Sequence, residues 1–392
     1  MKFANRCRDI TSFKAMDILA AAMELQAQGR DIVRMEVGEP AFATPQPVLE
    51  AAQQAMAAGH TKYTAACGIP QLREAVAELY RRRYGVTVAP GRVVITTGSS
   101  AALGMVCELL LNPGDGLLLS DPGYPCNPNF VRRLDAEPQR VPVDASNNFQ
   151  LTADLARSHW QTNTRGVMVA SPNNPTGEII TRENLVALHQ LTAEKQAALV
   201  VDEIYHGLTY SDTESDATDV ASILEVTDDA YVINSFSKYF GMTGWRLGWA
   251  IVPEVAQEKI NTLAQNFYIS SPAISQYAAL AALQPETEEI LEQRRQEFQR
   301  RRDFLVNGLR EIGFGINHLP AGAFYVYANV EKLTDNGEGF CWRMLREQGV
   351  AFTPGTDFGV HNANKYVRFT YTAEMDRLEE ALERLAVGVL SS

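Results

Sequence analysis

The chain has 392 residues, of which 46% are hydrophobic and 21% charged, which excludes collagen, extended coiled coil and wholesale disorder. Its net charge of -12 opposes non-specific attraction to nucleic acid or to anionic membranes. Five scattered cysteines without a C-x-x-C pair predict reduced thiols in a cytoplasmic protein without structural zinc, and we expect neither a signal peptide nor a transmembrane helix.

The first two thirds of the chain have the pattern of an α/β protein. A helix is predicted over residues 12–28, and a short extended segment follows it and stops at Pro40. Short apolar runs then alternate with helical stretches, at residues 92–97, 116–121, 165–170, 197–203, 231–236 and 246–252. This alternation indicates a mostly parallel sheet covered by helices on both faces.

The pattern changes near residue 285. A long charged helix is predicted from about 285 to 305, with its arginine run on a solvated face that binds no anion. Strand-like segments follow at 321–330, 350–355 and 366–371, and an amphipathic helix closes the chain over 373–390. We therefore expect a large domain over residues 41–285 and a small domain built from residues 1–40 and 286–392. The polar stretch 211–222 is predicted to be a surface loop.

Polar side chains follow the apolar runs, at the sheet edge where open α/β sheets bind ligands. Lys238 follows the run 231–236, and the same segment contributes Ser235, Ser237 and Arg246. Hydroxyls and a planar guanidinium suit a phosphate monoester, so the Lys238 amine would face a group that this phosphate carries.

A second anion-binding element is predicted at residues 98–100. Gly98, Ser99 and Ser100 stand where a strand turns into a helix, so backbone N–H groups and the helix dipole would point at an anion. Ser99 could equally act only as a helix cap, and both roles are compatible.

Asp202 ends an apolar strand, where a carboxylate is costly unless it meets a cation. A protonated pyridine nitrogen would be such a cation. Asn174 and Tyr205 offer hydrogen bonds suited to a phenolic ring oxygen, and Tyr124 offers a flat face for stacking. Walker, G-x-G-x-x-G, G-x-S-x-G and H-E-x-x-H motifs do not occur, which excludes the usual nucleotide-binding, hydrolase and zincin sites.

The segment SFSKYFGMTGWRLG (235–248) resembles the lysine signature of the class I and II aminotransferases at every constrained position. Further matches follow in the order of that family: VGEP (37–40), KYTAACGIPQLREA (62–75), SPNNPTG (171–177), VDEIY (201–205), GAFYV (322–326), PGTDFG (354–359) and VRFTY (367–371). The resemblance implies the fold-type-I architecture of enzymes that use pyridoxal 5'-phosphate (PLP), with a mostly parallel seven-stranded sheet between helices and a smaller α+β domain.

The resemblance also assigns roles to the candidate residues. It implies that Lys238 is the Schiff-base lysine and proton shuttle and that Asp202 pairs with the ring nitrogen. Asn174 and Tyr205 would bind the phenolic oxygen, and Tyr124 would stack on the ring. The phosphate would be held by Gly98, Ser99, Ser100, Ser235, Ser237 and Arg246, and by Tyr63 of the neighbouring subunit in a homodimer with shared active sites.

On the substrate side, Arg368 matches the arginine that grips the α-carboxylate, assisted by Asn174 and the backbone of Gly38. Without the resemblance, this arginine could lie on the solvent face of a strand. The implied activity is a ping-pong transfer of the amino group of an L-amino acid to a 2-keto acid through a Lys238 aldimine. His206, next to Tyr205, is expected to be structural, because Lys238 already serves as the base.

Our prediction of the amino donor rests on two positions at which this chain departs from the aspartate aminotransferases of the family. Some aspartate aminotransferases carry an arginine where this chain has Asn266, and others carry a lysine where it has Ser100. We therefore expect a neutral, aliphatic or aromatic donor, with 2-oxoglutarate or pyruvate as acceptor. The alternatives are a PLP-dependent carbon–sulfur β-lyase and an aspartate aminotransferase that uses another residue, such as Arg34. A non-catalytic regulator is disfavoured because Lys238 and its partners are present.

Overall fold

The largest element of the fold is a seven-stranded sheet with the strand order β2-β8-β7-β6-β5-β3-β4. The computed structural model describes residues 2–210 and 220–390, so most of the loop expected at 211–222 lies outside the described residues. The strands are β2 (Val93–Thr96), β3 (Gly116–Asp121), β4 (Glu137–Pro142), β5 (Thr164–Ala170), β6 (Ala198–Asp202), β7 (Tyr231–Ser235) and β8 (Gly248–Ile251). β8 runs antiparallel to both of its neighbours, β2 and β7, and the other pairs are parallel, which confirms the expected mostly parallel sheet.

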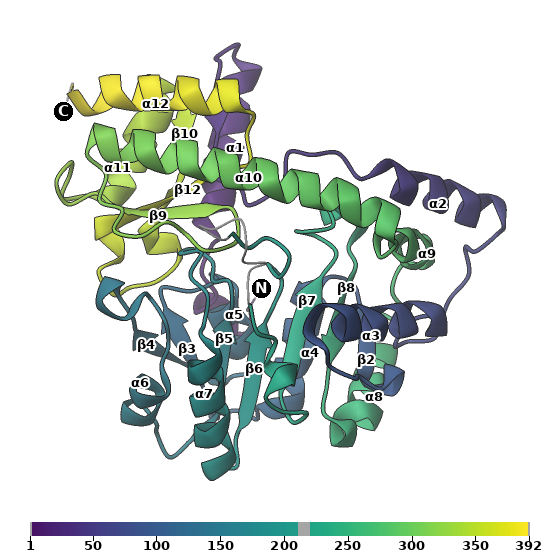
Figure 1. Cartoon of the computed structure of the whole chain (residues 1–392). Helices are drawn as coiled ribbons and strands as arrows, with labels where there is room; N and C mark the ends of the chain where they lie inside the picture. The colour runs from purple at the N-terminus through teal and green to yellow at the C-terminus, as the bar shows by residue number, and fades with distance from the viewer. Residues whose placement is uncertain (1, 211–219, 391–392) are drawn as a thin grey trace.

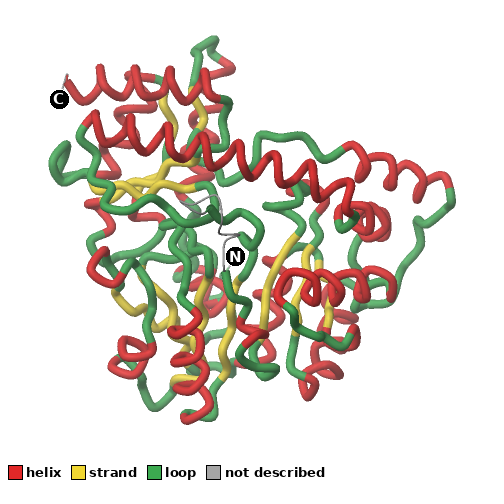
Figure 2. Tube along the Cα trace, viewed as in Figure 1, coloured by secondary structure: helices red, strands yellow, loops and turns green. Residues whose placement is uncertain are grey.

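Helices cover both faces of this sheet (Figures 1 and 2). Alternate strand residues point to opposite faces, so Val167 and Val169 join one apolar cluster while Met168 joins another. The covering helices include α3 (Pro70–Tyr84) and α7 (Arg182–Glu194) in the first cluster, and α4 (Ser99–Leu110), α5 (Asn127–Arg132) and α8 (Gln257–Phe267) in the second. Burial on both faces explains why the strands are continuous apolar runs in the sequence.

A smaller α+β part combines both ends of the chain. Its three-stranded antiparallel sheet has the order β11-β12-β9, and a parallel pair joins β1 to β10. The strands are β1 (Val33–Arg34), β9 (Tyr325–Asn329), β10 (Val350–Ala351), β11 (Thr353–Pro354) and β12 (Tyr366–Thr370). The helices around them are α1 (Lys14–Ala27), α10 (Pro285–Ile312), α11 (Gly337–Arg343) and α12 (Met375–Leu390). The pairing of β1 with β10 brings the N-terminal segment to the C-terminal strands.

The long helix α10 links the two parts of the molecule. Figure 1 shows it running from α9 (Ala273–Ala282), which packs against α2 (Gln46–Ala57), to a position beside α12. It is a single helix of 28 residues, longer than the 285–305 helix expected from the sequence, and the left-handed Gly313 ends it.

The arginine run of α10 is partly buried, which corrects the expectation of a solvated face. Arg301 and Arg302 are only 1% and 2% exposed. Arg301 donates a hydrogen bond to the carbonyl oxygen of Thr372, and Arg302 donates one to Pro320 and lies 5.0 Å from the ring centroid of Tyr210. These guanidinium groups are buried because each satisfies main-chain carbonyls at the junction of α10 with the smaller part.

No strand is expected from the sequence over residues 137–142, yet β4 forms there. This strand lies at the sheet edge, contains Pro138 and Pro142, and buries only alternate residues, Gln139 and Val141. Proline is tolerated at an edge because the missing N–H is not needed by a further strand, so the usual strand pattern is absent.

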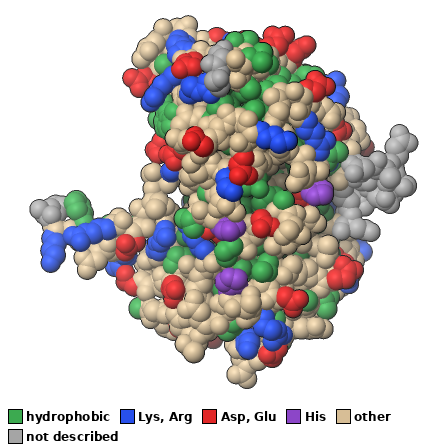
Figure 3. Space-filling model, turned by 90° about the vertical axis from the view of Figure 1, so that its left-hand side faces the viewer, with side chains coloured by type: hydrophobic (Ala, Val, Ile, Leu, Met, Phe, Trp, Pro, Cys, Tyr) green, Lys and Arg blue, Asp and Glu red, His purple; other side chains and the backbone are tan. Residues whose placement is uncertain are grey.

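The surface of the molecule carries charges of both signs, which are interspersed over the face drawn in Figure 3. The described residues at the N-terminus, 2–12, are all exposed. Within residues 2–210 and 220–390, no helix is both long and apolar enough to cross a membrane.

Candidate active site

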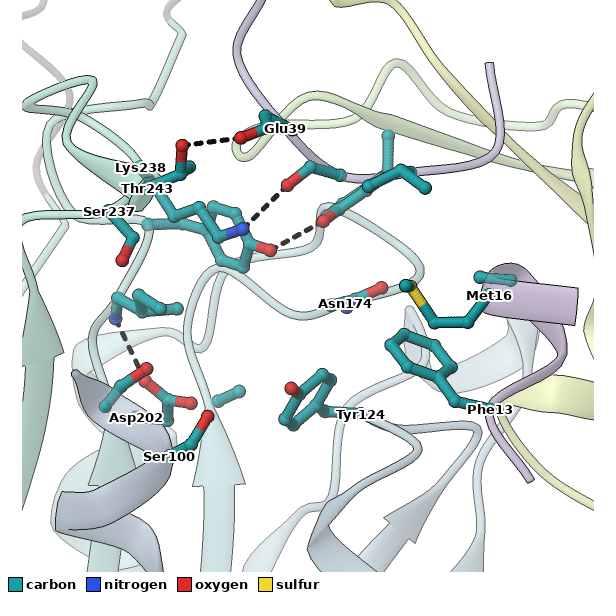
Figure 4. Close-up of a pocket in the computed structure, with 18 of the residues that line it drawn as sticks. Phe13, Met16, Glu39, Ser100, Tyr124, Asn174, Asp202, Ser237, Lys238 and Thr243 are labelled. Atoms are coloured by element: carbon teal, nitrogen blue, oxygen red, sulfur yellow. Dashed lines mark hydrogen bonds between the residues drawn. The ribbon is translucent and has the colours of Figure 1, made fainter. Parts of the chain in front are cut away.

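A cavity of about 380 Å³ lies at the carboxyl ends of β5, β6 and β7, where the sequence predicts the site. The N-terminus of α4, the segment after β1, the start of α1, and residues of β9 and β12 complete its wall. The predicted residues that line it are Gly38, Ser99, Ser100, Tyr124, Asn174, Asp202, Tyr205, Ser237, Lys238, Arg246 and Arg368. Figure 4 shows Ser237, Lys238 and Asp202 on one side of this cavity, and Phe13 and Met16 on the other.

Lys238 lies in the loop after β7 and carries the candidate nucleophilic amine. Its Nζ donates a hydrogen bond to the carbonyl oxygen of Gly38 at 2.6 Å. Burial, together with nearby Arg368 and Arg246, lowers the pKa of the Lys238 ammonium to about 8, although the negative charges of Glu39 and Asp202 oppose this shift. A lysine with this pKa is partly deprotonated near neutral pH, so it can act as a nucleophile and a base.

Asp202 ends β6 and is only 5% exposed. Its Oδ1 accepts a hydrogen bond from the backbone N–H of Ile204 at 3.1 Å, and burial raises the pKa of the carboxyl group to about 7. Among the described residues, no cationic side chain forms an ion pair with this carboxylate. A buried carboxylate that lines a cavity without such a partner suits a ligand that brings its own positive charge.

The start of α4 and the Arg246 side chain form an anion-binding element. Arg246 Nη1 donates to the carbonyl oxygen of Thr243 at 3.0 Å. A Cβ on Gly98 would lie 2.6 Å from Arg246 Nη2, and a Cβ on Gly248 would lie 2.8 Å from the Ser99 nitrogen. Gly98 therefore allows the guanidinium to approach the first turn of the helix, and Gly248 allows β8 to approach the same turn. Free N–H groups at this helix start favour an anion.

Ser235 is placed behind this element and does not line the cavity. Its hydroxyl donates to Leu247 O at 3.0 Å, lies 2.9 Å from the Ser237 hydroxyl, and accepts a hydrogen bond from the Ser237 N–H at 3.0 Å. Ser235 is 1% exposed, so its role in this structure is to hold Ser237 in position.

Arg368 on β12 is 1% exposed and lies between two aromatic rings. Its guanidinium carbon is 4.4 Å from the ring centroid of Tyr325 and 4.6 Å from that of Phe358. Nη1 donates to Asn174 Oδ1 at 2.9 Å, whereas the buried Nε has no partner among the described residues. A buried guanidinium with an unpaired donor suits a carboxylate ligand.

Tyr325 is an active-site residue that was not singled out from the sequence. Its hydroxyl lies 2.7 Å from that of Tyr205, and both side chains are buried. A Cβ on Gly38 would lie 1.9 Å from Tyr325 Oη, so this close approach requires glycine. Tyr325 lies within the GAFYV match at residues 322–326, which is the signal that could have identified it.

Nine further lining residues were not predicted: Phe13, Ala15, Met16, Val37, Glu39, Ala170, Ile204, Thr243 and Gly244. Thr243 Oγ1 donates to Glu39 Oε1 at 2.6 Å. The ring of Phe13 meets that of Tyr124 edge-on, with a centroid distance of 6.5 Å. Phe13, Ala15 and Met16 come from a segment without a chemical motif, so the sequence contained no local signal for them. Glu39 and Thr243 lie within the matches VGEP (37–40) and SFSKYFGMTGWRLG (235–248), which could have identified them.

Tyr63 and His206 lie outside the cavity. Tyr63 is 80% exposed on the surface of the single chain. His206 is buried, with Nδ1 2.7 Å from the Tyr84 hydroxyl, and burial lowers the pKa of its imidazole to about 3. A neutral, enclosed imidazole is consistent with the structural role expected for it.

The cavity therefore combines an amine, a buried carboxyl group that forms no ion pair among the described residues, and an anion-binding helix start. These groups fit a ligand that carries an electrophilic carbonyl, a protonated ring nitrogen and a phosphate. Arg368, which comes from β12, adds a separate site for a carboxylate in the same cavity.

Comparisons with known proteins agree with this chemistry. The family model described as "Aminotransferase class I and II" matches residues 30–385. The valine–pyruvate aminotransferase of Mycobacterium tuberculosis is 38% identical over 376 residues, which are 96% of each chain. The aspartate/prephenate aminotransferase of Thermus thermophilus is 36% identical and covers 94% of this chain and 93% of its own. A solved aminotransferase from M. tuberculosis superposes with a TM-score of 0.95 at 37% identity over 100% of both chains.

Proposed function

The chain belongs to the family of class I and II aminotransferases and is a transaminase, and we propose that it uses PLP to transfer the amino group of a neutral L-amino acid to a 2-keto acid. Enzymes of this family depend on PLP, and they act on amino acids and 2-keto acids. The observation that carries the cofactor proposal is the presence of Lys238, Asp202 and the α4 anion-binding element in one cavity.

When bound, PLP supplies an aldehyde and an electron-withdrawing ring that stabilises negative charge at the substrate α-carbon. In our proposal, Asp202 keeps the ring nitrogen protonated, and Asn174 and Tyr205 hold the phenolic oxygen. Tyr124 stacks on the ring. The phosphate is held by Gly98, Ser99, Ser100, Ser237 and Arg246, with Ser235 acting through Ser237.

Lys238 Nζ is the proposed covalent attachment point for the cofactor and the general base that takes the proton from the substrate α-carbon. The burial that lowers its pKa to about 8 supports this role, because a fully protonated lysine cannot accept a proton. The donor leaves as a keto acid before the acceptor binds, so the kinetics are expected to be ping-pong.

We propose that Arg368 binds the α-carboxylate of the substrate, assisted by Asn174 and the backbone of Gly38. The hydrogen bond from Arg368 to Asn174 fixes the guanidinium plane, and the two flanking rings restrict its rotation. A carboxylate can then bind through two parallel N–H groups.

The charges of the cavity support a neutral donor side chain. The cations that line it in the described chain are Lys238, Arg246 and Arg368, and each already has a proposed partner. Glu39 adds a carboxylate that would repel a second acidic group. Much of the remaining lining of the cavity is apolar and includes Phe13, Ala15, Met16, Val37 and Ile204.

The two positions at which some aspartate aminotransferases carry a cation also support a neutral donor. Asn266 is exposed, donates a hydrogen bond to Thr262 O at 2.8 Å and does not line the cavity. Arg34 pairs with Glu36 and likewise does not line the cavity. Ser100 lines it but is uncharged.

A donor panel tests this proposal. The PLP-loaded enzyme is assayed with alanine, valine, methionine, phenylalanine and aspartate, with 2-oxoglutarate or pyruvate as acceptor. We expect kcat/KM for the best apolar donor to exceed that for aspartate at least tenfold. A preference for aspartate would support the dicarboxylate alternative instead. Release of pyruvate and ammonia from cystathionine without an acceptor would support the β-lyase alternative.

We further propose a homodimer in which Tyr63 reaches the phosphate of the neighbouring subunit. The 80% exposure of this aromatic side chain supports a position at an interface. We also propose that residues 41–285 form one domain and that residues 1–40 and 286–392 form another. Closure of the smaller domain over the substrate would carry Arg368 toward the large sheet.

A further inference from the structure

The first turn of α1 is capped by a residue that is remote in the sequence. The N-cap residue Phe13 makes no side-chain capping bond. Instead, Asp357 accepts hydrogen bonds from the backbone N–H groups of Lys14, at 2.8 Å to Oδ1, and of Ala15, at 3.2 Å to Oδ2. Backbone N–H groups at a helix start are otherwise unsatisfied, and a carboxylate there also interacts favourably with the helix dipole.

This turn forms part of the cavity wall. Phe13, Ala15 and Met16 all line the cavity, and Phe13 meets Tyr124 edge-on. Figure 4 shows Phe13 and Met16 entering from the N-terminal segment, on the side of the cavity opposite Lys238. The preceding residues 2–12 are exposed, where Arg6 pairs with Asp135 at 2.5 Å and the Thr11 carbonyl oxygen accepts a hydrogen bond from Asn129 Nδ2 at 3.4 Å. The Asp357 hydrogen bonds are the ones made to the first turn itself.

Asp357 is itself held from two sides. β11, immediately before it, pairs with β12, and Thr353 is in register with Arg368. On the other side, Asp121 at the end of β3 accepts hydrogen bonds from the backbone N–H of Val360 at 3.0 Å. A Cβ on Gly359 would lie 1.7 Å from Asp121 Oδ1, so this approach requires glycine. The segment between these anchors also carries Phe358, which lies against Arg368.

We propose that Asp357 is a positioning residue for donor specificity: by capping α1 it holds Phe13, Ala15 and Met16 where they contact the substrate side chain. It shares a short segment with Phe358, so the same loop orients the apolar wall and supports the guanidinium that binds the α-carboxylate. The consequence for specificity rests on the proposed function, because it requires an apolar donor side chain at this wall.

The test compares large and small donors in Asp357→Ala, Asp357→Asn and wild-type enzyme. We expect Asp357→Ala to lower kcat/KM for phenylalanine and methionine at least fivefold more than for alanine, mainly through KM. Asparagine still offers one capping oxygen, so Asp357→Asn should stay within about threefold of the wild type. Equal losses for phenylalanine and alanine would overturn the proposal.

Two matched controls separate positioning from general destabilisation. Thr181 caps α7 by accepting a hydrogen bond from the Asn184 N–H at 3.2 Å, away from the cavity, so Thr181→Ala loses a cap without touching the wall. Glu338→Gln weakens the ion pair of the Lys14 side chain, whose Nζ–Oε2 distance is 2.5 Å, and leaves the Asp357 cap in place. Neither variant should change the ratio of phenylalanine to alanine, and a similar change in Thr181→Ala would overturn the proposal.

A double-mutant cycle and hydrogen exchange complete the test. If Asp357 acts through the wall, Asp357→Ala should change selectivity by less than twofold in a Phe13→Ala background, and additive effects would contradict it. Independently of activity, the peptide spanning residues 12–19 should exchange at least fivefold faster in Asp357→Ala than in Thr181→Ala. Unchanged exchange would refute the cap. A wild-type preference for aspartate would instead refute the proposed function, and the exchange result would still decide the role of Asp357.

Discussion

Replacement of Arg368 by lysine tests the proposed carboxylate site. Lysine keeps the positive charge but loses the planar fork, the stacking between Tyr325 and Phe358, and the two-point contact with a carboxylate. A hydrogen bond to a charged group contributes about 1.5–3 kcal/mol. Each 1.4 kcal/mol of binding free energy corresponds to about a factor of ten in the dissociation constant. Loss of one such bond therefore predicts that the dissociation constant of the amino donor rises about 10- to 150-fold.

The assay is a single-turnover reaction of PLP-loaded enzyme with increasing alanine, which separates binding from the rate at saturation. The matched control is Arg302→Lys, because Arg302 is also buried and also lies over an aromatic ring but does not line the cavity. Ethylamine, which lacks the carboxylate, should react equally slowly with the wild type and with Arg368→Lys. An unchanged affinity of Arg368→Lys for alanine, or an equal loss in Arg302→Lys, would refute the assignment.

Three further predictions concern the cofactor, the pH dependence of stability and the fit at Gly38. Arg246→Ala should raise the dissociation constant of PLP about 10- to 150-fold and leave that of pyridoxal unchanged in fluorescence titrations; equal losses would exclude a phosphate contact. Burial raises the pKa of the Glu203 carboxyl group from 4.5 to about 7. Between these two pH values the folded protein keeps a proton that the unfolded chain has released. The free energy of unfolding therefore falls as the pH rises from about 4.5 to about 7. Glu203→Gln should remove up to about 3 kcal/mol of that fall in urea titrations at pH 5 and pH 8, whereas an identical fall in the variant would contradict the assignment. Gly38→Ala should lower kcat at least tenfold because its Cβ would lie 1.9 Å from Tyr325 Oη and 2.8 Å from Tyr325 Cζ, and wild-type activity of Gly38→Ala would refute this cause.

The central sheet and much of the cavity could be predicted because their signals are local. Strands buried on both faces are continuous apolar runs, and the polar residues that follow them meet at one sheet edge. Lys238 and Asp202 were found in this way from the chain alone. Arg368 was different, because an arginine in a short strand has no distinctive pattern, and only the resemblance to a family identified it.

The remaining features depend on contacts between residues that are far apart in the chain. Asp357 caps α1 across 342 positions of sequence, and nothing near either residue signals the pairing. Arg301 is buried because α10 packs against the segment that carries Thr372, although its local pattern is that of an exposed helix face. Phe13 lines the cavity beside the ring of Tyr124 and next to a helix start whose N–H groups donate to Asp357, and both partners are remote in the sequence.

The most direct test of the account is the absorbance spectrum of the PLP-loaded wild type and of Lys238→Ala, before and after a single apolar amino acid is added without a keto acid. We predict a visible band in the wild type that the donor replaces with the near-ultraviolet band of pyridoxamine phosphate, with one equivalent of keto acid per active site. Lys238→Ala should show neither the protein-bound visible band nor the conversion. A wild-type protein that forms no such band with PLP, or a Lys238→Ala variant that behaves like the wild type, would contradict the central role of Lys238.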